Sequence, residues 1–203
     1  MKGGDKLLKR LILTLINGVA LFMILMQHTI TPKASKKTIL FGVKVPEDAK
    51  YYPEVEDLYE GYEKVSQIIG IISLIILSVL VFYFEKITFQ ILSIFLYIGI
   101  LFLIYLVFNY KARKIKRAKN WDKIGSQVTI VNKEDSLEFQ SKTEDDLWII
   151  GNIIYYNPED PSLFVEKRYG TGWAINMGRT LGKLIFLLLI IGLAIGIIKL
   201  IKI

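Results

Sequence analysis

The sequence predicts a mainly α-helical integral membrane protein in which four transmembrane helices, two of them joined as a tight hairpin, carry a small cytosolic β-containing module. Two observations indicate this fold. Hydrophobic residues make up 53% of the 203 residues and charged residues 22%, and the two kinds occupy separate blocks rather than alternating as they do on a soluble domain. There are four apolar blocks, and each approaches the length of about 20 residues that a helix needs to cross a bilayer.

The apolar blocks cover residues 11–26, 65–84, 87–108 and 184–198. Only Glu85 and Lys86 separate the second block from the third, so these two helices are expected to be antiparallel neighbours. The first block follows basic residues, as in a signal peptide, but no small-residue cleavage site follows Met26, and we interpret it as a retained helix. The expected segments are an N-terminal tail with the first helix (1–26), a cytosolic segment with an amphipathic helix (27–64), the transmembrane hairpin (65–108), a basic juxtamembrane segment with a small β-rich module (109–180) and the last helix (181–203).

Lysine and arginine predict the orientation in the membrane. Segments 27–64 and 109–180 hold eighteen of the 26 Lys and Arg residues, six of them in a run at 111–119. Positively charged loops stay on the cytoplasmic side, so both segments are expected inside and both termini outside, although a smaller group of N-terminal charges favours the opposite orientation. The basic run has no interleaved aromatic residues for base stacking, so it predicts an anchor on anionic lipid headgroups and not a nucleic-acid site.

Composition disfavours several kinds of chemistry. The chain has no cysteine and a single histidine, His28, so thiolate metal sites, cysteine nucleophiles and histidine-rich metal sites are not expected. The apolar blocks hold no ionisable residue at mid-depth, which argues against a pump or a coupled transporter. We therefore predict no catalytic residue, no metal and no cofactor.

The two polar segments show strand and helix patterns. Residues 38–45 alternate at strand period until Pro46, which predicts one strand. Pro53 fits the first position of a helix that continues into the second apolar block, and its apolar face is expected either at the membrane interface or against the other cytosolic segment. In the second polar segment strands are expected at 127–131 and 137–140, on both sides of a turn at Gly151-Asn152 within 148–156, and in a hairpin of 163–169 with 173–175.

Two stretches, KTILFGVKVPED (37–48) and YYNPEDPSLFVEKRYGTGWAIN (155–176), resemble elements of a group of uncharacterised bacterial multi-spanning membrane proteins. The longer element is the more distinctive, although Glu166 stands where proline is frequent in that group. Some members carry a domain shared with the immunity protein against the sporulation-delaying toxin, a domain that this sequence does not show. The resemblance implies a multi-pass protein of the bacterial cytoplasmic membrane and supplies no activity.

The longer element holds the residues that we expect to bind a partner. Glu159, Asp160 and nearby carbonyls offer too few ligands for calcium, so a turn in which Asn157 and Asp160 cap backbone amides is expected instead. Trp173 is expected near the membrane interface and Asn176 as the cap before the last helix. The complete set of candidate binding residues is Tyr155, Tyr156, Asn157, Asp160, Lys167, Arg168, Trp173 and Asn176.

The function expected from these patterns is that of a non-enzymatic membrane protein with a partner-binding, sensory or peptide-toxin immunity role. One alternative is a membrane enzyme that acts on lipid or prenyl substrates at the cytosolic face with Glu159, Asp160, Lys167 or Arg168; another is a small transporter or channel component. The expected partners are membrane lipids and a membrane or peptide partner. The spacing of Gly192 and Gly196 in the last helix suits either a homo-oligomer or packing within one chain.

Overall fold

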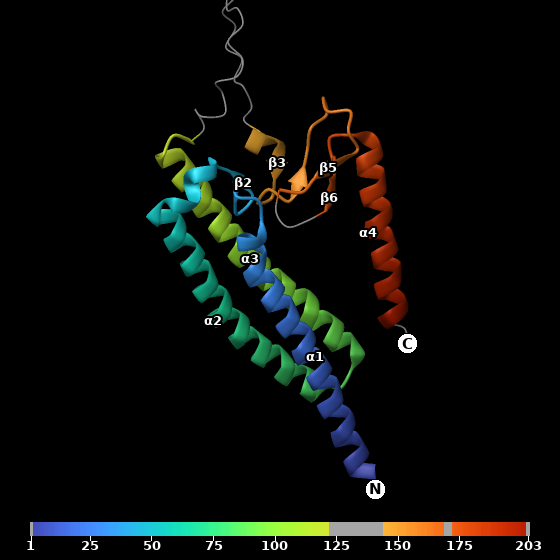
Figure 1. Cartoon of the computed structure of the whole chain (residues 1–203). Coiled ribbons are helices and arrows are strands. Elements are labelled where there is room, and N and C mark those ends of the chain that lie inside the picture. The colour runs from blue at the N-terminus through green and yellow to red at the C-terminus, as the bar shows by residue number, and fades with distance from the viewer. Residues whose placement is uncertain (1, 122–143, 169–171, 202–203) are drawn as a thin grey trace, which may run out of the picture. The chain divides into compact units, whose positions relative to one another are not determined.

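The computed structural model describes residues 2–121, 144–168 and 172–201 (Figure 1). The strands expected at 127–131 and 137–140 lie outside the described residues. In these residues the fold is mainly helical, with small β hairpins, and the four long helices are α1 (Lys2–Ala34), α2 (Pro53–Phe84), α3 (Ile87–Ala118) and α4 (Thr180–Ile201). The chain forms two compact units: unit 1 comprises Met1–Thr31, Glu60–Tyr105 and Ile190–Ile203, and unit 2 comprises Pro32–Tyr59 and Leu106–Leu189.

Three helices of the described chain, α1, α2 and α3, are long and apolar enough to cross a membrane. The described apolar part of α4, Thr180–Gly196, is shorter. Many large apolar side chains on these helices are exposed, and Leu15, Met23 and Leu103 each keep more than 60% of their surface accessible. Helices with apolar outer faces are what a hydrocarbon environment requires. Insertion into a bilayer, and a fourth crossing by α4, stay predictions.

The helices extend beyond the apolar blocks that predict them. Helix α1 continues eight residues past Met26 to Ala34, and α3 continues through the basic run to Ala118. Lysine, arginine and alanine are good helix formers, so the end of an apolar block does not by itself end a helix. Helix α2 begins at Pro53, as predicted, and the hairpin to α3 reverses at Glu85, whose φ of 53° lies in the left-handed region.

Within unit 1, α1 packs against α2 and α3 through a close approach at Gly70. A Cβ atom at this glycine would lie 2.5 Å from Leu25 Cδ1 of α1, and the Tyr97 hydroxyl of α3 donates to the Gly70 carbonyl at 3.2 Å. A further bond joins α3 to α1, where the Ser93 hydroxyl donates to Asn17 Oδ1 at 2.7 Å. Between apolar helices in lipid, the hydrophobic effect does not drive association, because lipid tails are as apolar as the side chains. Buried hydrogen bonds of this kind can hold such helices together.

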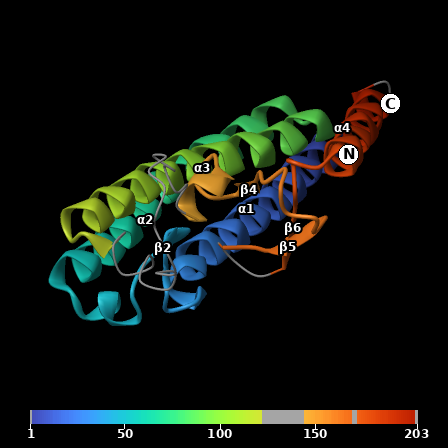
Figure 2. The same ribbon diagram turned by 90° about the horizontal axis from the view of Figure 1, so that it is seen from above.

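The described part of unit 2 contains three antiparallel hairpins (Figure 2). Strands β1 (Ile39–Leu40) and β2 (Val43–Lys44) form the first, β3 (Trp148–Ile149) and β4 (Ile154–Tyr155) the second, and β5 (Phe164–Glu166) and β6 (Trp173–Ile175) the third. A parallel bridge between Tyr155 and Asn176 connects the second hairpin to the third. The third hairpin and the turn at Gly151-Asn152 agree with the sequence prediction.

The prediction of one strand over 38–45 is wrong. The segment folds back on itself, because Phe41 and Gly42 adopt φ values of 46° and 81° between β1 and β2. Two consecutive left-handed residues form the tight turn that matches the twist of a hairpin, and glycine at the second position makes it accessible. Phe41 is buried there, with its ring 5.4 Å from that of Tyr59 on α2.

The start of α2 packs within the protein, which decides between the two alternatives for its apolar face. Val55 and Leu58 are buried. Just before the helix, the Tyr52 ring lies edge-on to Trp121, 5.4 Å away between centroids. This face is therefore covered by protein rather than by lipid headgroups.

Candidate functional site

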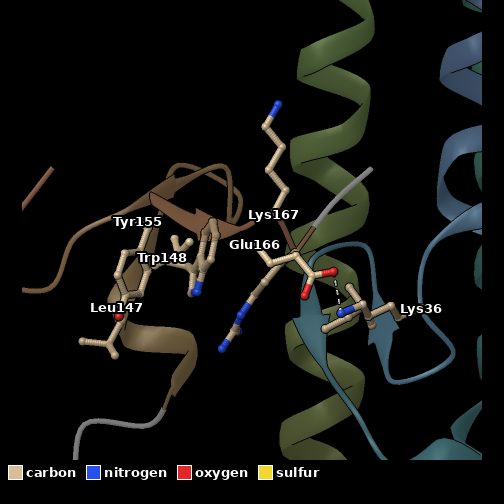
Figure 3. Close-up of a pocket in the computed structure, with 9 residues that line it drawn as sticks. Lys36, Leu147, Trp148, Tyr155, Glu166 and Lys167 are labelled. Atoms are coloured by element: carbon tan, nitrogen blue, oxygen red, sulfur yellow. Dashed lines mark ion pairs between the residues drawn. The ribbon is translucent and has the colours of Figure 1, made fainter. Parts of the chain in front are cut away.

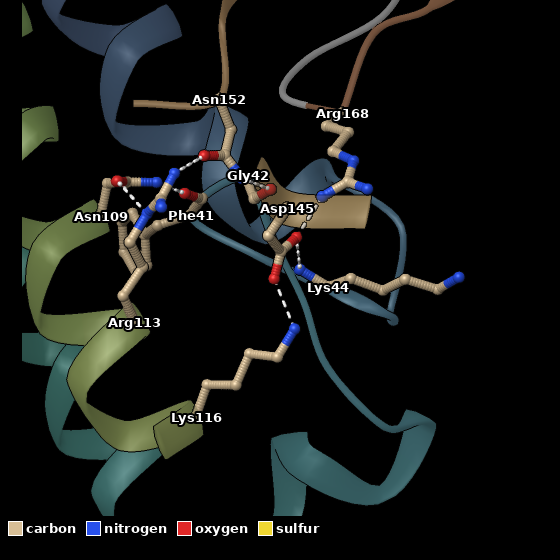
Figure 4. Close-up of polar contacts among 9 residues, drawn as sticks. All are labelled: Phe41, Gly42, Lys44, Asn109, Arg113, Lys116, Asp145, Asn152 and Arg168. Atoms are coloured by element: carbon tan, nitrogen blue, oxygen red, sulfur yellow. Dashed lines mark hydrogen bonds and ion pairs between the residues drawn. The ribbon is translucent and has the colours of Figure 1, made fainter. Parts of the chain in front are cut away.

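A buried carboxylate, Asp145, ties four segments of unit 2 together (Figure 4). It lies in a short 3-10 helix, η3 (Glu144–Leu147), and accepts bonds from Lys116 of α3 and from Arg168, which follows β5. The backbone N–H of Lys44 in β2 also donates to it, at 3.3 Å. One acidic side chain thus fixes the basic end of α3, the first hairpin and the third hairpin to one point.

The electrostatics of this cluster favour the ionised carboxylate. Burial by itself raises the pKa of Asp145, but the Lys116 ammonium and the Arg168 guanidinium outweigh burial and hold that pKa below its usual value. The side chains of Asp145, Lys116 and Arg168 keep only 9–11% of their surface exposed, so water screens the ion pairs little.

A second polar group joins the tip of the β3–β4 hairpin to α3 and to the turn of the first hairpin. Asn152 donates from Nδ2 to the Gly42 carbonyl and accepts at Oδ1 from Arg113 of α3. Asn109, one turn earlier on α3, donates to the Phe41 carbonyl at 2.7 Å. Because Asn152 is fully buried and has a φ of 65°, it supplies both the left-handed turn and the bonds that hold it.

These contacts correct the interpretation of the basic run. The run at 111–119 is predicted to be an anchor on lipid headgroups, whereas Lys116 is buried against Asp145 and Arg113 is bonded to Asn152. Lys111, Lys114 and Arg117 remain exposed. The signal in the sequence was the helical spacing of Asn109, Ala112, Arg113 and Lys116, which places a polar stripe with one small residue on a single face.

A pocket of about 290 Å³ lies beside this cluster (Figure 3). The rings of Trp148 and Tyr155 stand 5.1 Å apart between centroids, and the Arg168 guanidinium carbon lies 5.5 Å from the Trp148 ring centroid. At the rim, Lys36 forms an exposed ion pair with Glu166 at 2.7 Å. The pocket is lined by Lys36, Ile39, Leu147, Trp148, Tyr155, Val165, Glu166, Lys167 and Arg168.

Three of the predicted binding residues, Tyr155, Lys167 and Arg168, line this pocket. In Figure 3 the Lys167 side chain points away from the two aromatic rings, and it has no ion-pair or hydrogen-bond partner in the described part of the chain. Two more predicted binding residues, Asp160 and Asn157, hold Tyr155 in place. The Tyr155 hydroxyl donates to Asp160 at 2.9 Å and accepts from Asn157 at 3.2 Å.

The remaining predicted residues lie outside the pocket. Tyr156 and Trp173 are exposed side chains that do not line it. Asn176 is fully buried and is not a helix cap, because α4 begins four residues later at Thr180. Its amide accepts from the Asn157 backbone at 3.0 Å and donates to the carbonyls of Asn157 at 2.8 Å and Ser162 at 3.1 Å. This side chain is therefore used to hold the 157–162 loop against β6.

The capping turn predicted at 157–160 is confirmed. Asn157 Oδ1 accepts from the Glu159 backbone N–H at 3.0 Å, and Asp160 Oδ1 accepts from the Ser162 N–H at 2.8 Å. The bonds to Ser162 and to the Tyr155 hydroxyl lower the pKa of Asp160 below its usual value. Both side chains stabilise the loop behind Tyr155.

Sequence reasoning missed most of the pocket. Trp148 and Leu147 precede the distinctive element, and Lys36 and Ile39 lie more than a hundred residues away in the chain. Val165 and Glu166 lie within the element, but only the strand alternation marks Val165 as inward-facing. A pocket assembled from three hairpins has no local signature.

In its described residues, the chain is mainly helical, with three helices that could span a membrane and a small hairpin-rich module. Residues 158–183 match the protein family DUF5808, described as a family of unknown function. The match includes Val165, Glu166, Lys167 and Arg168 of the pocket, the start of α4, and Asn176, which holds the 157–162 loop. It agrees with the expected likeness to uncharacterised proteins, whereas the link to toxin immunity stays a prediction. No curated protein and no solved structure matches the chain.

Proposed function

We propose that this chain is a non-enzymatic, four-span protein of the bacterial cytoplasmic membrane whose cytosolic module binds an acidic peptide segment of a partner protein. Both termini lie outside, and the polar segments lie inside. The observation that carries the proposal is the pocket itself, because four of its residues come from the 158–183 segment shared with the family. Its chemistry combines an aromatic wall with cations.

The charge around the pocket favours an acidic ligand. Trp148 and Tyr155 offer ring faces for an apolar or aromatic side chain, and Lys167 has a cation that no described residue neutralises. Lys36 keeps 63% of its side chain exposed while it pairs with Glu166, so a competing carboxylate can reach it. Aromatic anchors with charges at the rim are typical of peptide-binding surfaces.

The strand that lines the pocket also supports peptide binding. Among the described strands β5 pairs only with β6, which leaves its other edge unpaired. An extended peptide can add to such an edge through backbone hydrogen bonds, while a neighbouring pocket selects one of its side chains. Val165 to Arg168 would then contact the peptide along its length.

Binding is better supported than catalysis. The side chains proposed for the enzyme alternative include Asp160 and Arg168, and both are held by internal partners: Asp160 by Tyr155, and Arg168 by Asp145. Arg168 is nearly buried in that pair. Arg168 held in this way lines the pocket, and Asp160 supports Tyr155 behind it, which suits recognition of a partner.

The test is recovery of the partner by the full chain from native membranes. Lys36→Glu places two carboxylates side by side at the rim, and we expect it to reduce recovery of the partner about tenfold or more. Lys37→Glu is the matched control, since it makes the same charge change at the next, exposed residue, which does not line the pocket. Equal recovery by both variants would contradict the proposal.

A further inference from the structure

The tip of the β3–β4 hairpin in unit 2 exposes three isoleucines. Ile149, Ile150 and Ile153 keep 44%, 53% and 39% of their surface accessible, and they flank the buried Asn152. By contrast, Trp148 and Tyr155 on the same two strands are 6% and 8% exposed. The described residues therefore leave the three isoleucines much less covered. Isoleucines gathered at one turn need an apolar neighbour, because exposed clusters of this kind mark interaction sites.

The backbone of the tip is unusual for the residue that it carries. Ile150 adopts a φ of 50°, in the left-handed region, followed by Gly151 at 66° and Asn152 at 65°. Glycine and asparagine suit such positions, whereas a β-branched residue rarely adopts this backbone conformation. The tip thus carries an exposed isoleucine at a position that glycine or asparagine would fit more easily.

The tip is anchored where the apolar part of α3 ends. Asn152 at the tip accepts from Arg113 of α3 and donates to the Gly42 carbonyl. The neighbouring Phe41 carbonyl accepts from Asn109, also of α3. On α3 the apolar residues end at Phe108, followed by the exposed Tyr110 and Lys111. A tyrosine followed by lysine is typical of the boundary between hydrocarbon and headgroups. The hairpin tip is thus held within one helical turn of that boundary.

We propose that this tip inserts into the headgroup region of the cytosolic leaflet, so that Ile149, Ile150 and Ile153 contact lipid while Lys111 and Lys114 contact anionic headgroups. The proposal rests on the membrane insertion of α3 included in the proposed function. Apolar side chains next to lysines gain from burial and from anionic lipid together. Because β3 and β4 supply Trp148 and Tyr155, lipid contact at the tip would also fix the two aromatic rings of the pocket.

Single labels can test this directly, because the chain has no cysteine of its own. The full chain would be reconstituted in vesicles of phosphatidylcholine and phosphatidylglycerol as three variants: Ile150→Cys at the tip, Glu159→Cys on an exposed loop of the same unit, and Leu103→Cys on α3. Each would carry an environment-sensitive fluorophore, and nitroxide-labelled lipid would serve as the quencher. We expect quenching at 150 to exceed that at 159 by about twofold or more, with blue-shifted emission.

The three positions separate the failures. Quenching at 103 but not at 150 would overturn the lipid contact and leave membrane insertion intact. Absence of quenching at both positions would overturn insertion and the lipid contact together. Blue-shifted emission at 150 that lipid does not quench would mean that protein, either a second copy or a partner, covers the tip, and this too would overturn the proposal.

Discussion

Replacement of Asp145 by alanine is expected to lower the free energy of unfolding of unit 2 by about 3–5 kcal/mol, because it leaves the Lys116 and Arg168 cations buried without a counter-charge. All three tryptophans, Trp121, Trp148 and Trp173, belong to this unit, so their fluorescence during denaturation in detergent reports on it alone. Asp146→Ala is the control, since it removes the neighbouring, exposed carboxylate. A loss for Asp145→Ala no larger than the control's would refute the stabilising role of the cluster.

The same carboxylate gives unit 2 a defined pH dependence. The pKa of Asp145 is lowered in the folded state, so its contribution to stability is fully present above its ordinary value of 3.8. That contribution is lost as the pH falls through the lowered pKa, where the proton removes the partner of two buried cations. Acid should therefore destabilise the natural chain more steeply than Asp145→Ala, in which this proton is absent.

Gly182→Ala is expected to destabilise the junction between β6 and α4, although alanine has the higher helix propensity of the two residues. A Cβ at this position would lie 3.0 Å from the carbonyl carbon of Asn176 and closer still to its oxygen, and neither backbone atom can move aside freely. Overpacking of this kind costs about 1–3 kcal/mol. Thermal unfolding followed by tryptophan fluorescence would measure the loss, because Trp173 lies in β6.

Gly192 provides the comparison on the same helix. A Cβ there meets no described atom within 4 Å, and alanine is favoured over glycine in a helix by about 1 kcal/mol. Gly192→Ala should therefore leave stability unchanged or raise it, in contrast to Gly182→Ala. Equal effects of the two substitutions would show that helix propensity, and not the contact with Asn176, governs this region.

The helices could be predicted from the sequence because their signals are local. Apolar blocks, Pro53 at the first position of α2 and the two-residue break at Glu85-Lys86 each act within a few residues. The hairpin at Gly151-Asn152 could be predicted equally well, since asparagine and glycine are the residues that adopt left-handed turns. The turn at Phe41-Gly42 was missed because phenylalanine rarely adopts that conformation, and strand alternation dominated the interpretation.

The candidate site was harder to predict from the sequence because long-range contacts assemble it. Lys116 reads as one more cation in a basic run until η3 brings Asp145 beside it, 29 residues later in the chain. Lys36 reaches Glu166 only once the first and third hairpins lie together. Asn176 reads as a helix cap by its position before α4, whereas its bonds to the 157–162 loop follow from the pairing of Tyr155 with Asn176.

The side of the membrane on which the module of unit 2 lies can be measured directly. Cysteines at Lys37 and Glu159, both exposed positions of unit 2, and at Lys86 in the hairpin between α2 and α3 would be treated in intact cells with an impermeant thiol reagent. If the polar segments lie inside, position 86 alone is labelled until the membrane is opened, after which 37 and 159 also react. Ready labelling of 37 and 159 from outside, or recovery of the chain without detergent in a soluble fraction, would contradict this orientation.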